Sequence, residues 1–178
     1  MMFRSVEPTA TEITATLPGD DVVPDANVVM DRAFTLPATP ELVWPWFEQL
    51  GRNRAGWYLP RSVERLIPRS RRALRHLDPT LGLEVGDVIA DWGGATATFE
   101  VAELERPSTL VHVSIRGHVR LSWAIVLTER TVGTRVHLRL RLGGVRRKRL
   151  ASVVGGVFDE ATVAGLAAGL RERLVSRR

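Results

Sequence analysis

The stretch VRLSWAIVLTERTVGTRVHLRLRL, residues 119–142, decides the fold of this chain. Apolar and polar residues alternate along it on both sides of Gly133, and a period of two is typical of β-strands with one buried face. The residues that share the apolar face are Val119, Leu121, Trp123, Ile125, Leu127, Val136, Leu138, Leu140 and Leu142. The pattern predicts antiparallel strands with an apolar inner face and a polar, solvated outer face.

The same period continues toward the N-terminus. Further strands are predicted at 28–36, 87–92, 96–104 and 109–116, with glycine or proline turn signals between the later ones. The two strands of the opening stretch are predicted at 119–128 and 134–142. Short connections between successive strands favour an antiparallel meander.

The strand at 109–116 is assigned by its own alternation. Three apolar residues fall on its inner face: Val111, Val113 and Ile115. His112 then falls on the outer face, as does His137 on its strand, and His118 lies beside a turn. We expect these histidines to be solvated. A metal site built from all three is not expected, because adjacent strands already lie ~4.8 Å apart and alternate strands about twice that.

A long helical segment is predicted at about 146–175. With the strands before it, this gives an α+β fold in which a curved antiparallel sheet wraps the C-terminal helix. One stripe of the helix begins with bulky residues such as Phe158 and continues with small ones such as Ala161 and Gly165. We expect the small residues to face the sheet and leave a void for a ligand; a fully packed core is the alternative. A second stripe, with Leu166 and Leu170, is available to meet another helix or a second subunit.

Aromatic residues concentrate in VWPWFEQLGRNRAGWY, residues 43–58, which holds three of the five tryptophans and the only tyrosine. A short helix is predicted from near Pro40, and Gly51 ends it. The aromatic pair Trp57-Tyr58 follows. Because large amphipathic rings dominate the energetics of cores and pockets, we expect this segment to cap one end of a hydrophobic cavity.

Composition bounds the class of protein. With 178 residues, 44% of them hydrophobic, the chain fits one globular domain. The absence of cysteine excludes disulfides and thiolate chemistry. No apolar run resembles a signal peptide or a membrane span, so a cytoplasmic location is the expectation. The net charge is +5, but no nucleic-acid-binding motif accompanies it, and we expect no nucleic-acid partner.

Charge is unevenly distributed along the chain. Residues 1–27 are acidic and proline-punctuated, and we interpret them as a partly extended arm laid along the body. Residues 52–75 are rich in arginine. The acidic arm is one candidate to neutralise them, and weak association with an anionic membrane surface is the other.

Several motifs resemble those of START-like proteins of the SRPBCC superfamily, also called helix-grip or polyketide cyclase/dehydrase-like, in a mostly actinobacterial group. They include Leu17-Pro-Gly-Asp-Asp, Val43-Trp-Pro-Trp-Phe, Arg54-Ala-Gly-Trp-Tyr and Val85-Gly-Asp. The resemblance runs from Leu17 to the C-terminal helix. It implies a helix-grip fold with an internal cavity, formed by a single START-like domain at 28–176. Glu64 matches a recurrent acid of the group, whereas residues 59–68 otherwise depart from its pattern.

Two functions remain open at this point. The first is binding of an apolar small molecule or lipid without catalysis, in a site expected to be lined by Arg54, Trp57, Tyr58, Glu64, Trp92, Phe99, Trp123, Phe158, Ala161 and Gly165. The second is an aromatase/cyclase-type enzyme, which the superfamily includes and for which Tyr58, Asp91 and Glu64 are the candidate acids or bases. For Arg54, hydrogen bonding to backbone carbonyls is an equal alternative. We expect no cofactor and no metal, and the oligomeric state is not determined by the sequence.

Overall fold

The computed structural model describes residues 6–94, 96–145 and 160–175. Its elements in chain order are α1 (Ala10–Thr14), β1 (Val28–Leu36), α2 (Pro40–Glu48), α3 (Arg61–Glu64), η2 (Arg69–Arg71), η3 (Pro79–Leu81), β2 (Val88–Ala90), β3 (Thr98–Glu105), β4 (Thr109–Arg116), β5 (Val119–Arg130), β6 (Gly133–Gly143) and α5 (Glu160–Val175). The predicted α+β class is therefore confirmed. Within these ranges, no helix is both long and apolar enough to span a bilayer.

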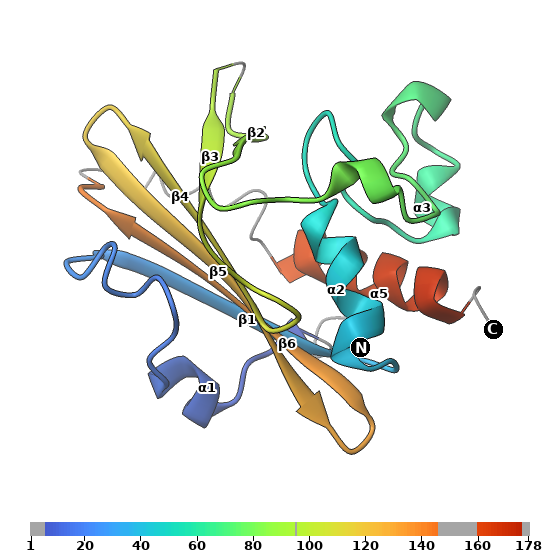
Figure 1. Cartoon of the computed structure of the whole chain (residues 1–178), viewed down its shortest axis with the longest axis horizontal. Coiled ribbons are helices and arrows are strands. Elements are labelled where there is room, and N and C mark those ends of the chain that lie inside the picture. The colour runs from blue at the N-terminus through green and yellow to red at the C-terminus, as the bar shows by residue number, and fades with distance from the viewer. Residues whose placement is uncertain (1–5, 95, 146–159, 176–178) are drawn as a thin grey trace.

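All six strands form one antiparallel, curved sheet in the order β1-β6-β5-β4-β3-β2. Strands β2 to β6 follow one another as the predicted meander, and β1 closes the row beside β6. Helices α2 and α5 cover one face of the sheet, while α1 and the N-terminal segment cover the other (Figure 1). This arrangement is consistent with a helix-grip-like fold.

Helix α2 begins where the sequence predicts. Pro40 occupies its first turn, where the missing N–H is no loss, and the helix ends just before Gly51, whose φ of 155° few other residues adopt readily. Its apolar side is buried, with Trp46 and Phe47 among the least exposed side chains of the protein. The helix packs against β5 and β6.

The inner face of β5 and β6 is built as predicted. Its members are almost completely buried, and directly opposite residues share that face: Leu127 pairs with Val136, and Ile125 pairs with Leu138. Side chains of α2 and α5 join them in one core. Complete burial of a leucine or isoleucine side chain contributes about 1.5–3 kcal/mol, so this face is the main source of stability.

The face assignment predicted for β4 is wrong. In the β4–β5 register His112 lies opposite Trp123, and Leu110 lies opposite Ile125, so His112 is on the inner face. Val111 and Ile115 are on the outer face instead, and Ile115 is 78% exposed. The physical cause is the turn at 117–118, which pairs Arg116 with Val119 and thereby fixes the parity of the whole strand.

The outer face of the sheet is not uniformly solvated, which corrects a second expectation. Residues 6–27, the N-terminal arm, lie across β1 and β6, and Arg139 beneath them is only 3% exposed. The arginines bound by the arm are therefore those of the sheet: Arg135 binds Glu12, and Arg139 binds Asp20. None of the arm's ion pairs within the described ranges reaches residues 52–75.

Helix α5 uses its two stripes differently from the prediction. The stripe carrying Val163, Leu166 and Leu170 is fully buried in the core, and the helix contacts β1 and α2. The glycines face the segment after Trp57: a Cβ on Gly165 would lie 2.8 Å from Leu59 Cδ2, and one on Gly169 would lie 2.7 Å from the Leu59 backbone. These glycines permit close helix–loop packing, and they do not open a void against the sheet.

Candidate functional site

Three rings cluster on the inner face where β3, β4 and β5 run side by side. The ring of His112 lies 5.2 Å from that of Trp123 in a stacked arrangement and 5.7 Å from that of Phe99. Phe99 and Trp123 are themselves 5.8 Å apart. Strand pairing positions all three, because the register places each of them at an inward-facing position of its own strand. The result is an aromatic cluster with one ionisable group inside it.

His112 is buried without a polar partner. It is 2% exposed, and neither Nδ1 nor Nε2 has a hydrogen-bond partner in the described part of the chain. Burial away from water, together with the weaker effect of the positive charge of Arg54, lowers the pKa of His112 to about 3. The imidazole is therefore neutral at physiological pH, with one nitrogen able to donate and the other able to accept.

His112 belongs to a row of residues that crosses the inner face. It lies opposite Trp123, which lies opposite Leu140, which lies opposite Met30 on the edge strand β1. Trp123 and Leu140 each retain 4–5% exposure, whereas Ile125 and Leu138 in the neighbouring row retain none. The row of His112 is thus the less completely covered of the two.

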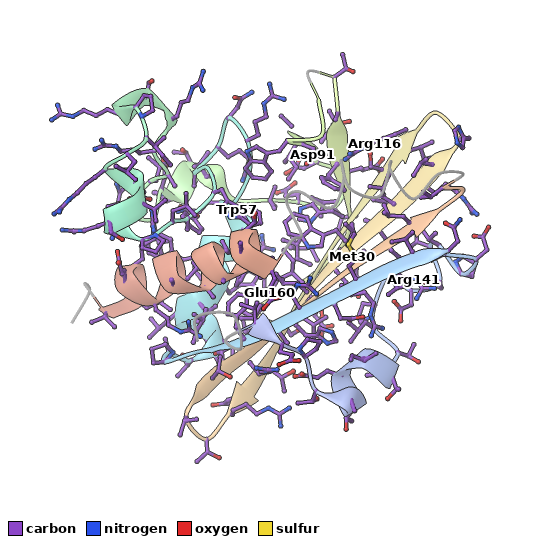
Figure 2. The ribbon with its side chains drawn as sticks, turned by 180° about the vertical axis from the view of Figure 1, so that it is seen from behind. Met30, Trp57, Asp91, Arg116, Arg141 and Glu160 are labelled. Atoms are coloured by element: carbon purple, nitrogen blue, oxygen red, sulfur yellow. The ribbon has the colours of Figure 1, made fainter. Side chains whose placement is uncertain are left out.

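A groove opens at the β1 end of this row. It has a volume of about 670 Å³ and is lined by Val6, Glu7, Pro8, Ile13, Val29, Met30, Asp31, Arg32 and Glu160. Met30 contributes to both the groove and the row. Figure 2 shows Met30 near Glu160, the first residue of α5, and shows Asp91 and Arg116 together, farther across the sheet toward β2.

The rim near β2 is formed by two pairs of side chains. The rings of Trp57 and Trp92 meet edge to face at 5.4 Å, and Trp57 Nε1 donates to the carbonyl of Thr162 in α5. Arg116 forms an ion pair with Asp91 and lies 5.2 Å above the ring of Phe99. This rim joins the sheet, the loop after α2 and the start of α5 around the aromatic cluster.

Three polar residues of the predicted binding site, Arg54, Tyr58 and Glu64, bond to backbone or side-chain groups of the protein. The Nη2 of Arg54 donates to the carbonyls of Glu48, Leu81 and Gly82 at 3.0, 2.5 and 3.1 Å, which matches the structural alternative given above. Tyr58 is fully buried and donates to the carbonyl of Trp46 at 2.9 Å. Burial raises the pKa of Tyr58, so its hydroxyl stays protonated.

Glu64 is part of a buried ion pair. Arg173 of α5 is 1% exposed and binds Glu64 Oε1 at 2.6 Å, while Arg75 binds Oε2 at 2.7 Å. Burial raises the pKa of Glu64, but the two guanidinium partners outweigh it, and the net pKa is lowered. Glu64 therefore stays ionised and attaches the loop of α3 to α5.

On α5, the predicted site residues do not form one surface. Ala161 is exposed, Gly165 contacts Leu59, and Phe158 lies outside the described residues. The structure thus brings together Phe99 and Trp123, and pairs Trp57 with Trp92 beside them. Arg54, Tyr58 and Glu64 belong to the structural contacts of the loops.

Sequence reasoning missed His112, although a signal for it existed. If the glycine signal at 117 is taken as a two-residue turn, Arg116 must face Val119, and His112 must face Trp123. His137 lies on the opposite face of the sheet, where it contacts Asp31 at 2.7 Å. In the ranges that the structure describes, no group of three or more His, Asp or Glu side chains is positioned to hold a metal ion.

Comparison with known proteins supports the fold. No protein-family model matches the sequence, and no curated protein matches it at a significant level. Among solved structures, a protein of Rhodobacter sphaeroides superposes with a TM-score of 0.54 at 15% identity, over 87% of this chain and 97% of that one. CalU16 from Micromonospora echinospora superposes with a TM-score of 0.51 at 15% identity, over 84% and 82%.

DynU16, a putative protein in the dynemicin biosynthetic locus, gives a TM-score of 0.50 at 15% identity, over 84% of this chain and 48% of its own. At such low identity these similarities establish a shared α+β fold with a curved antiparallel sheet and a C-terminal helix. They do not by themselves assign a ligand or a reaction.

Proposed function

We propose that this chain binds an apolar small molecule or lipid on the inner face of its sheet, with His112 as the polar contact. The observation that carries the proposal is the buried imidazole whose two nitrogens have no partner among the described residues. A buried polar group left unsatisfied costs about 1–3 kcal/mol, and native proteins keep few of them. A ligand that bonds to His112 accounts for its presence there.

The surroundings of His112 define the class of ligand. Phe99 and Trp123 offer aromatic faces, and the row through Leu140 to Met30 is apolar. A neutral imidazole donates one hydrogen bond and accepts one. The ligand is therefore largely apolar and carries a hydroxyl or carbonyl group, and the groove beside Met30 is its route of entry. The internal cavity and START-like membership inferred from the motifs are part of this proposal.

The alternative is a polyketide aromatase/cyclase-type enzyme, and the similarity in fold to DynU16 is its external support. His112 would then be the base. The best general base has a pKa near the working pH, and a pKa of about 3 makes this imidazole a weak one. Asp91 is bound to Arg116, and Tyr58 stays protonated and bonded to Trp46. These facts favour binding over catalysis.

Native mass spectrometry of the protein purified from cells tests the proposal, with a solvent-extracted sample as the reference. We expect an apolar compound to co-purify with the wild type and to be lost, or strongly reduced, in His112→Phe, which keeps an aromatic ring but removes both nitrogens. His118→Phe is the matched control because it makes the same change at an exposed turn. Equal ligand content in His112→Phe and wild type would refute the role of His112.

A further inference from the structure

The segment 61–72, here called the basic loop, combines positive charge with exposed apolar side chains. It contains α3 and η2, and its five arginines are Arg61, Arg65, Arg69, Arg71 and Arg72. Its single acid, Glu64, is buried. Leu66 near its centre is 86% exposed, and Val63 is 41% exposed. The exposed surface of the loop is thus cationic and apolar together.

The arginines of this region divide into two groups. Arg72 stabilises the loop internally. Its Nε donates to the carbonyl of Ile67 at 2.8 Å, and its Nη2 donates to that of Arg65 at 3.3 Å. Arg75, just after the loop, is held by Glu64 and Glu172. The side chains of the other four form no hydrogen bond or ion pair within the described residues: Arg61, Arg65, Arg69 and Arg71.

Ion pairs and a hydrogen bond to α5 fix the part of the loop that exposes Leu66. Glu64, two residues earlier, is clamped between Arg173 and Arg75, and the backbone N–H of Arg61 donates to Glu172 at 2.9 Å. These contacts attach the first turn of the loop to α5, and the ion pair of Arg75 with Glu172 attaches the segment just after it. Leu66 is therefore held outward by the fold, among four arginines whose guanidinium groups form no ion pair with a described residue.

We propose that the basic loop docks on the surface of an anionic lipid bilayer, with Leu66 inserted below the headgroups and the four unpaired arginines at the lipid phosphates. Interfacial membrane segments carry this combination of basic residues and projecting apolar side chains. A second copy of the chain is a poor partner, because like charges would face each other. Duplex nucleic acid would satisfy the arginines but would leave Leu66 in water.

Vesicle co-sedimentation tests this surface independently of any cargo. The wild type is expected to bind vesicles of phosphatidylcholine mixed with phosphatidylglycerol, to bind pure phosphatidylcholine far less, and to lose binding as salt is raised. Leu66→Asp should weaken binding by about tenfold or more. Ile115→Asp is the matched control, because Ile115 is 78% exposed on the opposite face of the sheet.

A triple charge reversal, Arg65→Glu, Arg69→Glu and Arg71→Glu, should abolish the preference for anionic vesicles while leaving the thermal unfolding midpoint unchanged. It avoids Arg72 and Arg75, whose contacts hold the loop together. Equal binding to both vesicle types, full binding by Leu66→Asp, or tight binding to duplex DNA in place of vesicles would each overturn the proposal.

Discussion

Each face of the sheet buries a strongly polar side chain, Arg139 on the outer face and His112 on the inner one, and the two differ in their hydrogen bonding. On the outer face, Arg139 is 3% exposed, and its five N–H donors bind Asp31, Asp20 and the carbonyls of Ala15, Glu12 and Ile13. On the inner face, His112 is 2% exposed and has no hydrogen bond to any described residue. A buried group whose donors are all satisfied serves the fold, whereas an unsatisfied one needs an explanation, and a bound ligand is the explanation proposed for His112.

The largest effect on stability is expected from replacing Arg139, the side chain whose donors are all hydrogen-bonded. Arg139→Met should lower the free energy of unfolding by about 3–5 kcal/mol, because it removes the buried guanidinium partner of Asp31 and Asp20 and the donor to three carbonyls of the arm. Urea denaturation at neutral pH measures it. Arg130→Met is the control, since Arg130 is exposed at the end of β5.

Arg139→Lys sharpens the same comparison. It keeps the charge but cannot reproduce the planar fork of five donors, so an intermediate loss is expected. A loss below about 1 kcal/mol in Arg139→Met, as for an ordinary surface ion pair, would show that the arm contributes little to the fold.

His112→Phe should change the free energy of unfolding in the opposite direction. Because the imidazole is unsatisfied in the free protein, replacing it by an apolar ring of similar shape should raise the free energy of unfolding by about 1–3 kcal/mol. The same variant is expected to lose ligand. Stabilisation together with loss of binding is the signature of a functional residue, and destabilisation would instead mean that His112 serves the fold.

The contrast between the faces also shows what the sequence can and cannot predict. Alternation along residues 119–142 was sufficient for the inner faces of β5 and β6, because leucine and arginine differ strongly in their cost of burial. It failed for β4, where valine and isoleucine occupy the outer face: Val111 is covered there by Gly19 of the arm, and Ile115 is exposed. Pairing register outweighed the local pattern.

The candidate site was predictable only in part, for a related reason. Aromatic residues such as Phe99 and Trp123 were identifiable from their strand parity, which needs only local sequence. The pairing of Glu64 with Arg173 joins residues 109 positions apart. Nothing local indicates such a partner, so the sequence alone favours a place for the same acid in the ligand site.

A pH titration of stability extends the comparison. The ordinary pKa of a histidine is near 6.5, and that of folded His112 is about 3, so between these values the unfolded chain binds a proton that the folded chain does not. The free energy of unfolding therefore does not depend on His112 protonation above pH 6.5. As the pH falls toward 3, this linkage lowers it by at most about 1.4 kcal/mol per pH unit.

His112→Phe lacks this loss, and its advantage over the wild type should grow on acidification. Urea denaturation of both proteins between neutral pH and pH 4 measures the difference, with His118→Phe again as the control. A constant difference across this range would mean that the imidazole is not shielded from solvent protons.

The smallest effect on stability is expected from Glu12 of the N-terminal arm. Glu12 binds Arg135 through both carboxylate oxygens at 2.7 and 2.8 Å, and this hydrogen bonding is the main reason that its pKa is lowered to about 2. Glu12→Gln keeps an oxygen for the backbone N–H of Thr9 but loses the charge, which should cost about 1 kcal/mol at neutral pH. Glu7→Gln, at an exposed position of the same arm, is the control.

The sign of the pH dependence distinguishes this contribution from that of His112. A carboxylate with a lowered folded pKa stabilises the protein above its unfolded value of 4.5, and the contribution disappears as the pH falls through about 2. The deficit of Glu12→Gln should therefore be constant from pH 7 to pH 5 and shrink below pH 4.5, whereas the His112 effect develops at higher pH. If the Glu12→Gln deficit instead shrinks between pH 7 and pH 5, the two faces of the sheet are not independent, and the arm contributes to the environment of the inner site.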